Sequence, residues 1–245
     1  MKRRSWLGRR RRRPVSEDFA RADAHVAGDD YLRWLCRIVG GFLDEGSGNL
    51  RAFDHALRQL PAGAPIIEIG SFLGLSTLVL AHLAARHAPS SRVFSCDPWL
   101  FEGTEAPIGG VFDAGSERYR DYARRTFRRN VETFATERAP HSFEMASNAF
   151  FDAWSAGREL DDLFGARVRL GGPIGFAYID GNHTYEAAHA DFAAVDRHLA
   201  SGGFVLFDDS EDNGPFGSTK AAREVAADPR YELVFQRPNH FFRRR

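Results

Sequence analysis

The sequence has little of what secreted, membrane-spanning or repetitive proteins need. Its 245 residues include two cysteines, Cys36 and Cys96, which have neither CxxC spacing nor a paired framework. This excludes a disulfide scaffold and favours free thiols in a reducing, cytoplasmic compartment. No apolar run approaches the roughly 20 residues that a bilayer-spanning helix requires, so we expect no membrane segment. Internal repeats are also absent, which leaves a globular protein.

The formal net charge of zero hides an asymmetry. Lys2 and seven arginines lie within residues 1–13, and three arginines end the chain; the remainder carries 22 basic against 33 acidic residues. We expect residues 1–16 to form a disordered basic tail and residues 17–245 to form one folded domain. No apolar stretch follows Arg3-Arg4, which excludes a twin-arginine export signal. The acidic body argues against a nucleic-acid partner despite the arginines. The sequence leaves open whether the protein forms a homo-oligomer.

Apolar runs alternate with helical patterns through most of the chain. Buried strands are predicted at Ile66 to Ile69, Val93 to Cys96, Phe143 to Met145, Phe176 to Ile179 and Phe204 to Phe207, with helices between them. This order predicts an α/β fold with a doubly wound, mostly parallel, seven-stranded sheet. Residues 231–235 and 240–242 would close it as a C-terminal antiparallel hairpin. A helical cap is expected over residues 17–62, with helices from Asp18 to Leu43 and from Phe53 to Leu60, ahead of a core over 63–245.

Three carboxylates follow two of these strands. Asp180 comes directly after one predicted strand, and Asp208-Asp209 comes after the next. The carboxyl ends of parallel strands open into the crevice where such sheets bind ligands, and clustered negative charges there need neutralising. A hard divalent cation such as Mg²⁺ suits oxygen ligands. Adjacent strand residues point to opposite faces, so Asp209 can join Asp208 only if the chain turns there.

A glycine turn lies where the first strand meets its helix, in the segment Glu68-Ile69-Gly70-Ser71-Phe72-Leu73-Gly74-Leu75-Ser76-Thr77. Gly70 permits a tight turn, and Gly74 would let the backbone approach a ligand. The GxxxG spacing differs from the GxGxxG that places a helix terminus on a pyrophosphate. A nicotinamide-dependent oxidoreductase is therefore disfavoured.

This turn, together with Asp97 at the end of the next strand, resembles motifs I and II of class I S-adenosylmethionine-dependent methyltransferases. The resemblance implies a cofactor site that contains Glu68, Gly70, Ser71, Gly74, Ser76, Thr77 and Asp97. It implies that Asp97 accepts both ribose hydroxyls in a bidentate hydrogen bond. Ser147 resembles a position near the adenosine.

The segments Tyr178 to Glu186, Leu199 to Gly203 and Phe207 to Asp209 resemble the "IDG-x-H-x-Y…L-x-x-GG…DD" pattern of one methyltransferase subgroup. That subgroup includes macrocin and mycinamicin sugar O-methyltransferases and cephalosporin hydroxylase-like proteins. The resemblance implies that Asp180, Asp208 and Asp209 hold Mg²⁺ and that Asp180 and His183 are catalytic. His183 would be the general base, because histidine side chains titrate near neutral pH. Capping or packing at a helix start is the other reading of His183.

These patterns predict Mg²⁺-assisted O-methylation of a small hydroxylated substrate, with a sugar or a glycosylated natural product favoured. The alternatives are a catechol or phenol O-methyltransferase, a non-catalytic accessory protein that only binds the cofactor, and an RNA methyltransferase that uses the basic tail. The glycine-rich segment Phe101 to Ser116 is expected to close over the substrate with Trp99, Phe101 and Phe112, or to be a floppy insertion.

Overall fold

The computed structural model describes residues 24–43, 48–100, 115–135 and 138–245. The predicted basic tail and Phe101 and Phe112 of the predicted lid lie outside the described residues. The helices are α2 (Asp30–Ile38), α3 (Gly48–Leu57), α4 (Leu75–His87), α5 (Glu117–Phe134), α6 (Ser147–Ser155), α7 (Tyr185–Asp196) and α8 (Ser218–Ala227). The strands are β1 (Ile66–Ile69), β2 (Val93–Cys96), β3 (His141–Phe143), β4 (Glu159–Asp161), β5 (Arg167–Arg169), β6 (Ile174–Ile179), β7 (Leu199–Phe207), β8 (Tyr231–Gln236) and β9 (His240–Arg244).

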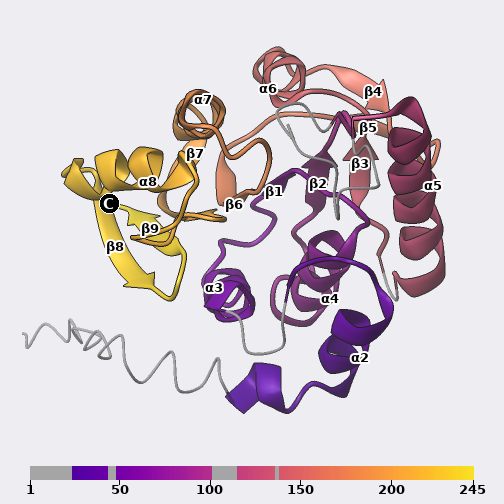
Figure 1. Cartoon of the computed structure of the whole chain (residues 1–245), viewed down its shortest axis with the longest axis horizontal. Coiled ribbons are helices and arrows are strands. Elements are labelled where there is room, and N and C mark those ends of the chain that lie inside the picture. The colour runs from indigo at the N-terminus through magenta and orange to yellow at the C-terminus, as the bar shows by residue number, and fades with distance from the viewer. Residues whose placement is uncertain (1–23, 44–47, 101–114, 136–137) are drawn as a thin grey trace, which may run out of the picture.

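One seven-stranded sheet organises the molecule, in the order β3-β2-β1-β6-β7-β9-β8 (Figure 1). The first five strands pair in parallel, while β9 pairs antiparallel with both β7 and β8. The predicted fold class is thus confirmed, including the C-terminal hairpin. The third strand lies two residues earlier than predicted, at His141–Phe143. A separate two-stranded sheet, β4 with β5, was not predicted.

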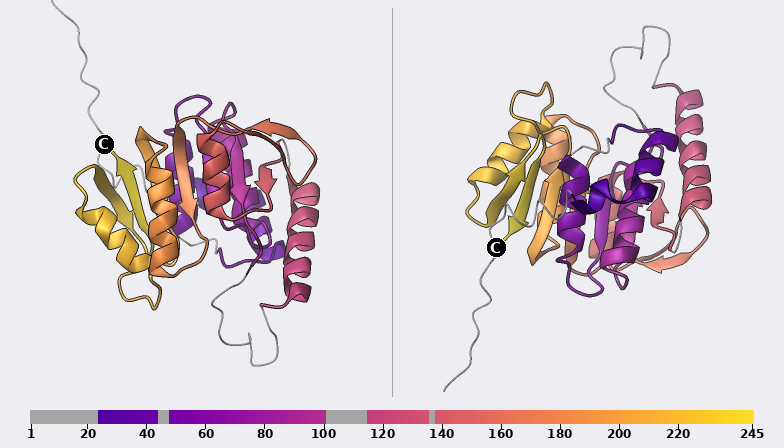
Figure 2. Two further views of the ribbon diagram at one scale, coloured as in Figure 1. Left: turned by 90° about the horizontal axis from the view of Figure 1, so that it is seen from above. Right: turned by 90° about the horizontal axis from the view of Figure 1, so that it is seen from below.

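Strand alternation divides the core into two layers. Phe176, Tyr178 and Phe204 pack on the face covered by α3 and α4, whereas Ala177 and Ile179 pack on the face covered by α6, α7 and α8. Figure 2 shows helices on both sides of the sheet. A side chain that follows β6 or β7 by one residue therefore returns to the α3 side, because the period of a strand is two.

The predicted single helix from Asp18 to Leu43 is interrupted, and this part of the prediction was wrong. Helical residues 24–27 end at Gly28, and Asp29 begins α2 by accepting hydrogen bonds from the amides of Tyr31 and Leu32. Asp29 is buried and also meets His82 and Arg86 of α4, each at 2.8 Å. A carboxylate that both caps one helix and pairs with another fixes the cap on the core.

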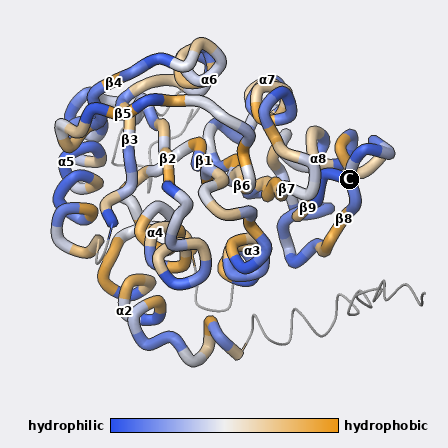
Figure 3. Tube along the Cα trace, turned by 180° about the vertical axis from the view of Figure 1, so that it is seen from behind, coloured by the Kyte–Doolittle hydropathy of each residue, from blue (hydrophilic) through white to orange (hydrophobic). Residues whose placement is uncertain are grey.

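Hydropathy follows the layers. In Figure 3, segments of the central strands are orange, whereas much of α5, at the sheet edge, is blue. Within the described ranges, no helix has the length and hydropathy needed to cross a membrane.

The backbone at the carboxyl ends of β1 and β6 is in close contact. Ile69 pairs with Ile179, and the amide of Asp180 donates to the carbonyl of Ile69 at 2.8 Å. Gly70 then turns with φ of 85°, and a Cβ built on it would lie 1.9 Å from the carbonyl oxygen of Asp180. Only glycine satisfies both the left-handed backbone and this approach.

Replacing Gly70 with alanine should therefore destabilise the fold. The loss should be far larger than for the same substitution at a glycine that has a similar left-handed backbone but no atoms near the position of the added Cβ. We expect Gly70→Ala to lower the free energy of unfolding by on the order of 3–5 kcal/mol, because a backbone clash adds to φ strain. Gly63 has φ of 78° and nothing within 4 Å of the position that a Cβ would take, so Gly63→Ala should cost about 1–2 kcal/mol. Urea unfolding of both variants measures the difference; equal losses would contradict the close-contact argument.

Candidate functional site

A cavity of about 1240 Å³ opens at the carboxyl ends of the parallel strands. Its lining includes the turn after β1, the residue after β2, the start of α6 and the segments after β6 and β7. We call the part around Gly70, Ser71 and Asp97 the glycine-turn end, and the part around Asp180 and Asp208 the carboxylate end. The volume exceeds that of many small-molecule sites, so two ligands can be held side by side.

Strand register brings Asp180 and Asp208 together at the carboxylate end. Ile179 pairs with Phe207, so the residues that follow are neighbours, and the amide of Asp208 donates to the carbonyl of Ile179 at 2.9 Å. About a quarter of the Asp180 side chain (26%) is exposed, in the cavity that it lines. Burial, and then the charge of Asp208 and a hydrogen bond with it, raise the pKa of Asp180 well above its usual value. Two negative charges this close repel each other unless a cation lies between them.

The chain turns directly after β7, which is the condition for Asp209 and Asp208 to face the same site. Asp209 adopts a left-handed conformation with φ of 47°, so its side chain does not simply point to the face opposite Asp208. Its Oδ2 lies 3.4 Å from His183 Nε2, and the same nitrogen lies 3.9 Å from Asp180 Oδ1. Burial, and then Asp208, raise the pKa of Asp209, while His183 opposes the shift. His183 therefore sits between two of the predicted acidic residues.

The predicted helix-start role does not fall to His183. Thr184 is the N-cap of α7, since its side chain accepts a hydrogen bond from the amide of Ala187. The His183 ring instead lies 5.2 Å from the ring of Phe216, and both residues line the cavity. Capping is therefore ruled out for His183, whereas its ring does pack beside Phe216, and its role as general base stays a prediction.

The described residues do not assemble a complete metal cage. Among them, no group of three or more His, Cys, Asp or Glu side chains is arranged to hold a metal ion. The three-aspartate ligand set consequently stays a prediction. The donor chemistry of the Asp180–Asp208 pair still fits Mg²⁺, because this ion commonly takes one or two carboxylates and completes its octahedron with water and substrate oxygens.

Asp97 anchors the glycine-turn end. Its Oδ2 accepts from the amides of Ser71 at 2.8 Å and Phe72 at 2.9 Å, and its Oδ1 accepts from the amide of Trp99 at 2.6 Å. Because a carboxylate oxygen offers two lone pairs, Oδ2 is saturated and Oδ1 has room for one more donor. Burial raises the pKa of Asp97 against the effect of these amides. Asp97 therefore has room for one ribose hydroxyl, at Oδ1, rather than for both as expected.

Glu68 lies beneath the turn and does not line the cavity. It is completely buried, and its Oε2 accepts hydrogen bonds from the hydroxyls of Ser71 and Thr77. Its Oε1 has no hydrogen-bond partner in the described part of the chain. Burial is the main cause that raises the pKa of Glu68 to about 7. This residue supports the turn from below.

The structure gathers most of the predicted site residues around one cavity. Those that line it are Gly70, Ser71, Ser76, Asp97, Ser147, Asp180, His183, Asp208 and Asp209. Thr77 is buried with Glu68, and Gly74, with φ of 94°, faces Phe127, which would lie 3.1 Å from an added Cβ. Gly74 thus makes room for α5, which corrects the expected approach of its backbone to a ligand.

Trp99 is not a lid residue. It is buried, packs 5.2 Å from the ring of Phe127, and donates from Nε1 to the carbonyl of Phe72 at 2.8 Å. The expectation that it closes over a substrate was wrong, because the large indole and its polar N–H are both satisfied inside the core.

Four residues that line the cavity were not singled out from the sequence: Asn49, Tyr178, Asp191 and Asn239. Ser147 donates its hydroxyl to Asp191 of α7, a buried cavity residue whose pKa burial raises to about 6. Asn49 of α3 and Asn239, between β8 and β9, both donate to Asp208 Oδ1. Tyr178 had a signal, its two-residue spacing from Asp180 on one strand. No pattern marked the other three, because they come from other elements.

Comparison with known proteins identifies the family. A family model described as a methyltransferase domain matches residues 67–210, which is more than half of the chain. The chain belongs to the methyltransferase domain family. No curated protein sequence matches it.

Solved structures of methyltransferases share the fold of this methyltransferase at low sequence identity. CalS11, a calicheamicin methyltransferase, is 16% identical with a TM-score of 0.54, over 99% of this chain and 98% of that chain. The O-methyltransferase NovP is 16% identical with a TM-score of 0.52, over 94% and 97%. The S-adenosylhomocysteine-bound PaMTH1 of Podospora anserina is 15% identical with a TM-score of 0.52, over 98% and 99%. These likenesses show that the chain has the fold of these methyltransferases.

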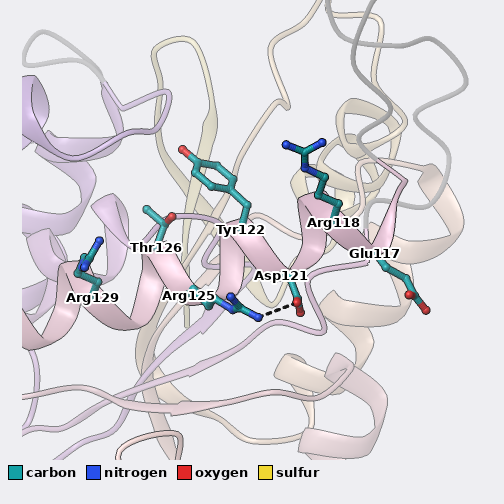
Figure 4. Close-up of a pocket in the computed structure, with 7 residues that line it drawn as sticks. All are labelled: Glu117, Arg118, Asp121, Tyr122, Arg125, Thr126 and Arg129. Atoms are coloured by element: carbon teal, nitrogen blue, oxygen red, sulfur yellow. Dashed lines mark hydrogen bonds and ion pairs between the residues drawn. The ribbon is translucent and has the colours of Figure 1, made fainter.

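A second hollow, of about 860 Å³, runs along α5 of the methyltransferase (Figure 4). Its described lining comes from this one helix: Glu117, Arg118, Asp121, Tyr122, Arg125, Thr126 and Arg129. Arg125 and Asp121 form an ion pair at 3.0 Å. None of the predicted site residues lies there, so the hollow is a charged surface feature separate from the cavity.

The raised pKa of Glu68 predicts a pH-dependent stability. The pKa of Glu68 is 4.5 in the unfolded chain and about 7 in the folded protein. Because the folded state resists ionisation of this carboxyl, the free energy of unfolding decreases as pH rises above 4.5. Relative to wild type, cofactor-free Glu68→Gln should therefore gain on the order of 2–3 kcal/mol between pH 4.5 and pH 8. Urea unfolding of both proteins at several pH values measures this gain. A difference that stays constant with pH would contradict the burial argument.

Proposed function

We propose that this methyltransferase transfers the methyl group of S-adenosylmethionine to a hydroxyl of a small molecule, with Mg²⁺ held by Asp180 and Asp208. One observation carries the proposal: the register-aligned pair Asp180 and Asp208 shares a cavity with the glycine turn and Asp97. The cofactor would occupy the glycine-turn end. The acceptor would occupy the carboxylate end.

The residues of the carboxylate end suit the activation of an alcohol. In the reaction the carbon–sulfur bond of the sulfonium breaks, a carbon–oxygen bond forms, and the hydroxyl proton must leave. His183 Nε2 faces the cavity beside Asp180 and Asp209 and is the group we assign to take that proton. When bound, Mg²⁺ would lower the pKa of the acceptor hydroxyl and orient two adjacent oxygens. Asp180 and Asp208 would hold it, and Asp209 would orient the imidazole.

A sugar or a glycosylated natural product is the acceptor class that we propose. One structure of CalS11, 17% identical with a TM-score of 0.50, is described as a TDP-rhamnose 3'-O-methyltransferase of calicheamicin biosynthesis. Vicinal hydroxyls of a sugar match the chelation that a carboxylate-bound Mg²⁺ favours. Phe216, which is 42% exposed and lines the cavity, offers an apolar surface for a ring or an aglycone.

Substitutions at the two ends of the cavity should affect cofactor binding differently. We expect Asp97→Asn to weaken S-adenosylhomocysteine binding by about 10-fold or more, because a charged acceptor for three backbone amides and a ribose hydroxyl is lost. Asp180→Asn should leave this affinity within about 2-fold, since it lies at the other end, and should abolish methyl transfer. Isothermal titration calorimetry with S-adenosylhomocysteine measures the first quantity. Equal loss of affinity in both variants would refute the division.

Methyl transfer itself is tested with methyl-labelled S-adenosylmethionine and a panel of nucleotide sugars, glycosides and catechols. We expect a glycoside or sugar to be methylated on oxygen, with turnover lost on chelation and restored by Mg²⁺. His183→Ala should lower kcat by about 10²–10⁴-fold because the general base is removed. Turnover on catechols alone would favour the phenol alternative. Cofactor binding without transfer to any acceptor, with or without Mg²⁺, would favour an accessory protein instead.

A further inference from the structure

Two buried asparagines from opposite ends of the chain meet at Asp208. Asn49 is in the first turn of α3, and Asn239 precedes β9; each is 6% exposed. Asn239 Nδ2 donates to Asp208 Oδ1 at 2.7 Å and to Asn49 Oδ1 at 3.0 Å. Asn49 Nδ2 donates to the same Asp208 Oδ1 and lies 3.3 Å from the Tyr178 hydroxyl. The helical cap and the C-terminal hairpin therefore converge on one carboxylate oxygen.

A count of donors and acceptors shows which oxygen of Asp208 the two asparagines occupy. A side-chain amide has two N–H donors and a carboxylate oxygen has two lone pairs. Both Nδ2 groups are used within the cluster, and Asp208 Oδ1 is filled by two amide donors. Oδ2 is then the oxygen of Asp208 left for partners in the cavity. The asparagines themselves have no donor left for a ligand, so any influence on the reaction must pass through Asp208.

The backbone around the cluster is fixed from both sides. A Cβ built on Gly48 would lie 1.6 Å from the carbonyl oxygen of Arg237, so α3 contacts the turn that carries Asn239. Asn239 Oδ1 accepts from the amide of Ser210 at 2.9 Å, which ties the segment after Asp209 to the same turn. The direction of the two amides is thus set by packing that does not involve the cavity.

We propose that Asn49 and Asn239 are positioning residues that saturate Asp208 Oδ1 and thereby aim Oδ2 at the cation and acceptor. The inference rests on the proposed function, because it assigns a role within the same site. It makes α3 and the β8–β9 turn part of the acceptor site. It also explains why an acidic residue beside Asp180 is held by neutral donors: cationic partners would cancel the charge that binds a cation.

The test uses Mn²⁺ as a spectroscopic substitute for Mg²⁺, and needs no acceptor. Mn²⁺ binding to the full chain saturated with S-adenosylhomocysteine is followed by electron paramagnetic resonance. Asn49→Leu is close in size to the native residue and removes the donor without adding a charge beside Asp208. We expect it, and Asn49→Ala and Asn239→Ala, to weaken Mn²⁺ binding by about 10–100-fold, the usual effect of losing an outer-shell partner. S-adenosylhomocysteine affinity should stay within about 2-fold of wild type.

A matched control separates positioning from packing. Asn130 also donates a side-chain amide to buried structure, the carbonyl of Leu73 at 2.8 Å. Asn130→Ala should leave Mn²⁺ affinity unchanged. If folded Asn49→Leu and Asn239→Ala bind Mn²⁺ like wild type, the inference is wrong while the proposed methyl transfer stands. If wild type binds no Mn²⁺, the metal role and the inference both fall, and the labelled-methyl assay still decides the reaction separately. Parallel loss of Mn²⁺ and S-adenosylhomocysteine would show a packing role and overturn the inference.

Discussion

The close pairing of β1, β6 and β7 at their carboxyl ends is the constraint on which the rest depends. Ile69 pairs with Ile179, which pairs with Phe207, so the next residues on each strand are forced side by side. Glycine at position 70 lets the first of these turns lie against the backbone of the second. The same register that buries three hydrophobic residues therefore fixes where two carboxylates and the glycine turn meet.

This alignment creates an electrostatic conflict that the surroundings only partly resolve. Asp180 and Asp208 come together where burial and mutual repulsion raise the pKa of Asp180. Asp209 turns toward His183, and the amides of Asn49 and Asn239 support Asp208. Neutral donors stabilise one oxygen without removing the charge. An uncompensated carboxylate in a cavity is costly to the fold, and such a cost is typical of sites that bind a cation or move a proton.

The sequence predicted those parts of the molecule that follow from local period and local order. Runs such as Phe176 to Ile179 indicated buried strands, and the residues after them indicated the site, because strand ends meet at one edge. The helix break before α2 was missed although its signal is local, because Gly28 ends one helical segment and Asp29 caps the next. The pairing of Asp29 with Arg86, 57 residues away, had no local signal. Trp99 was misplaced for the same reason: its partner, the carbonyl of Phe72, is remote in sequence. Asn49 and Asn239 are separated by 190 residues, and no spacing rule connects them.

The two ends of the cavity therefore differ in how they are encoded. The glycine-turn end is built from consecutive segments, Gly70 to Ser76 and Asp97, whose geometry is set by one β–α–β unit, and so it is legible as a motif. The carboxylate end combines two strand ends with a helix of the cap and the turn of the terminal hairpin. Changes in the cap or hairpin can alter what meets Asp208 without disturbing the β–α–β unit of the glycine-turn end. On the proposed division of the cavity, such a fold can keep one methyl donor while its acceptor changes.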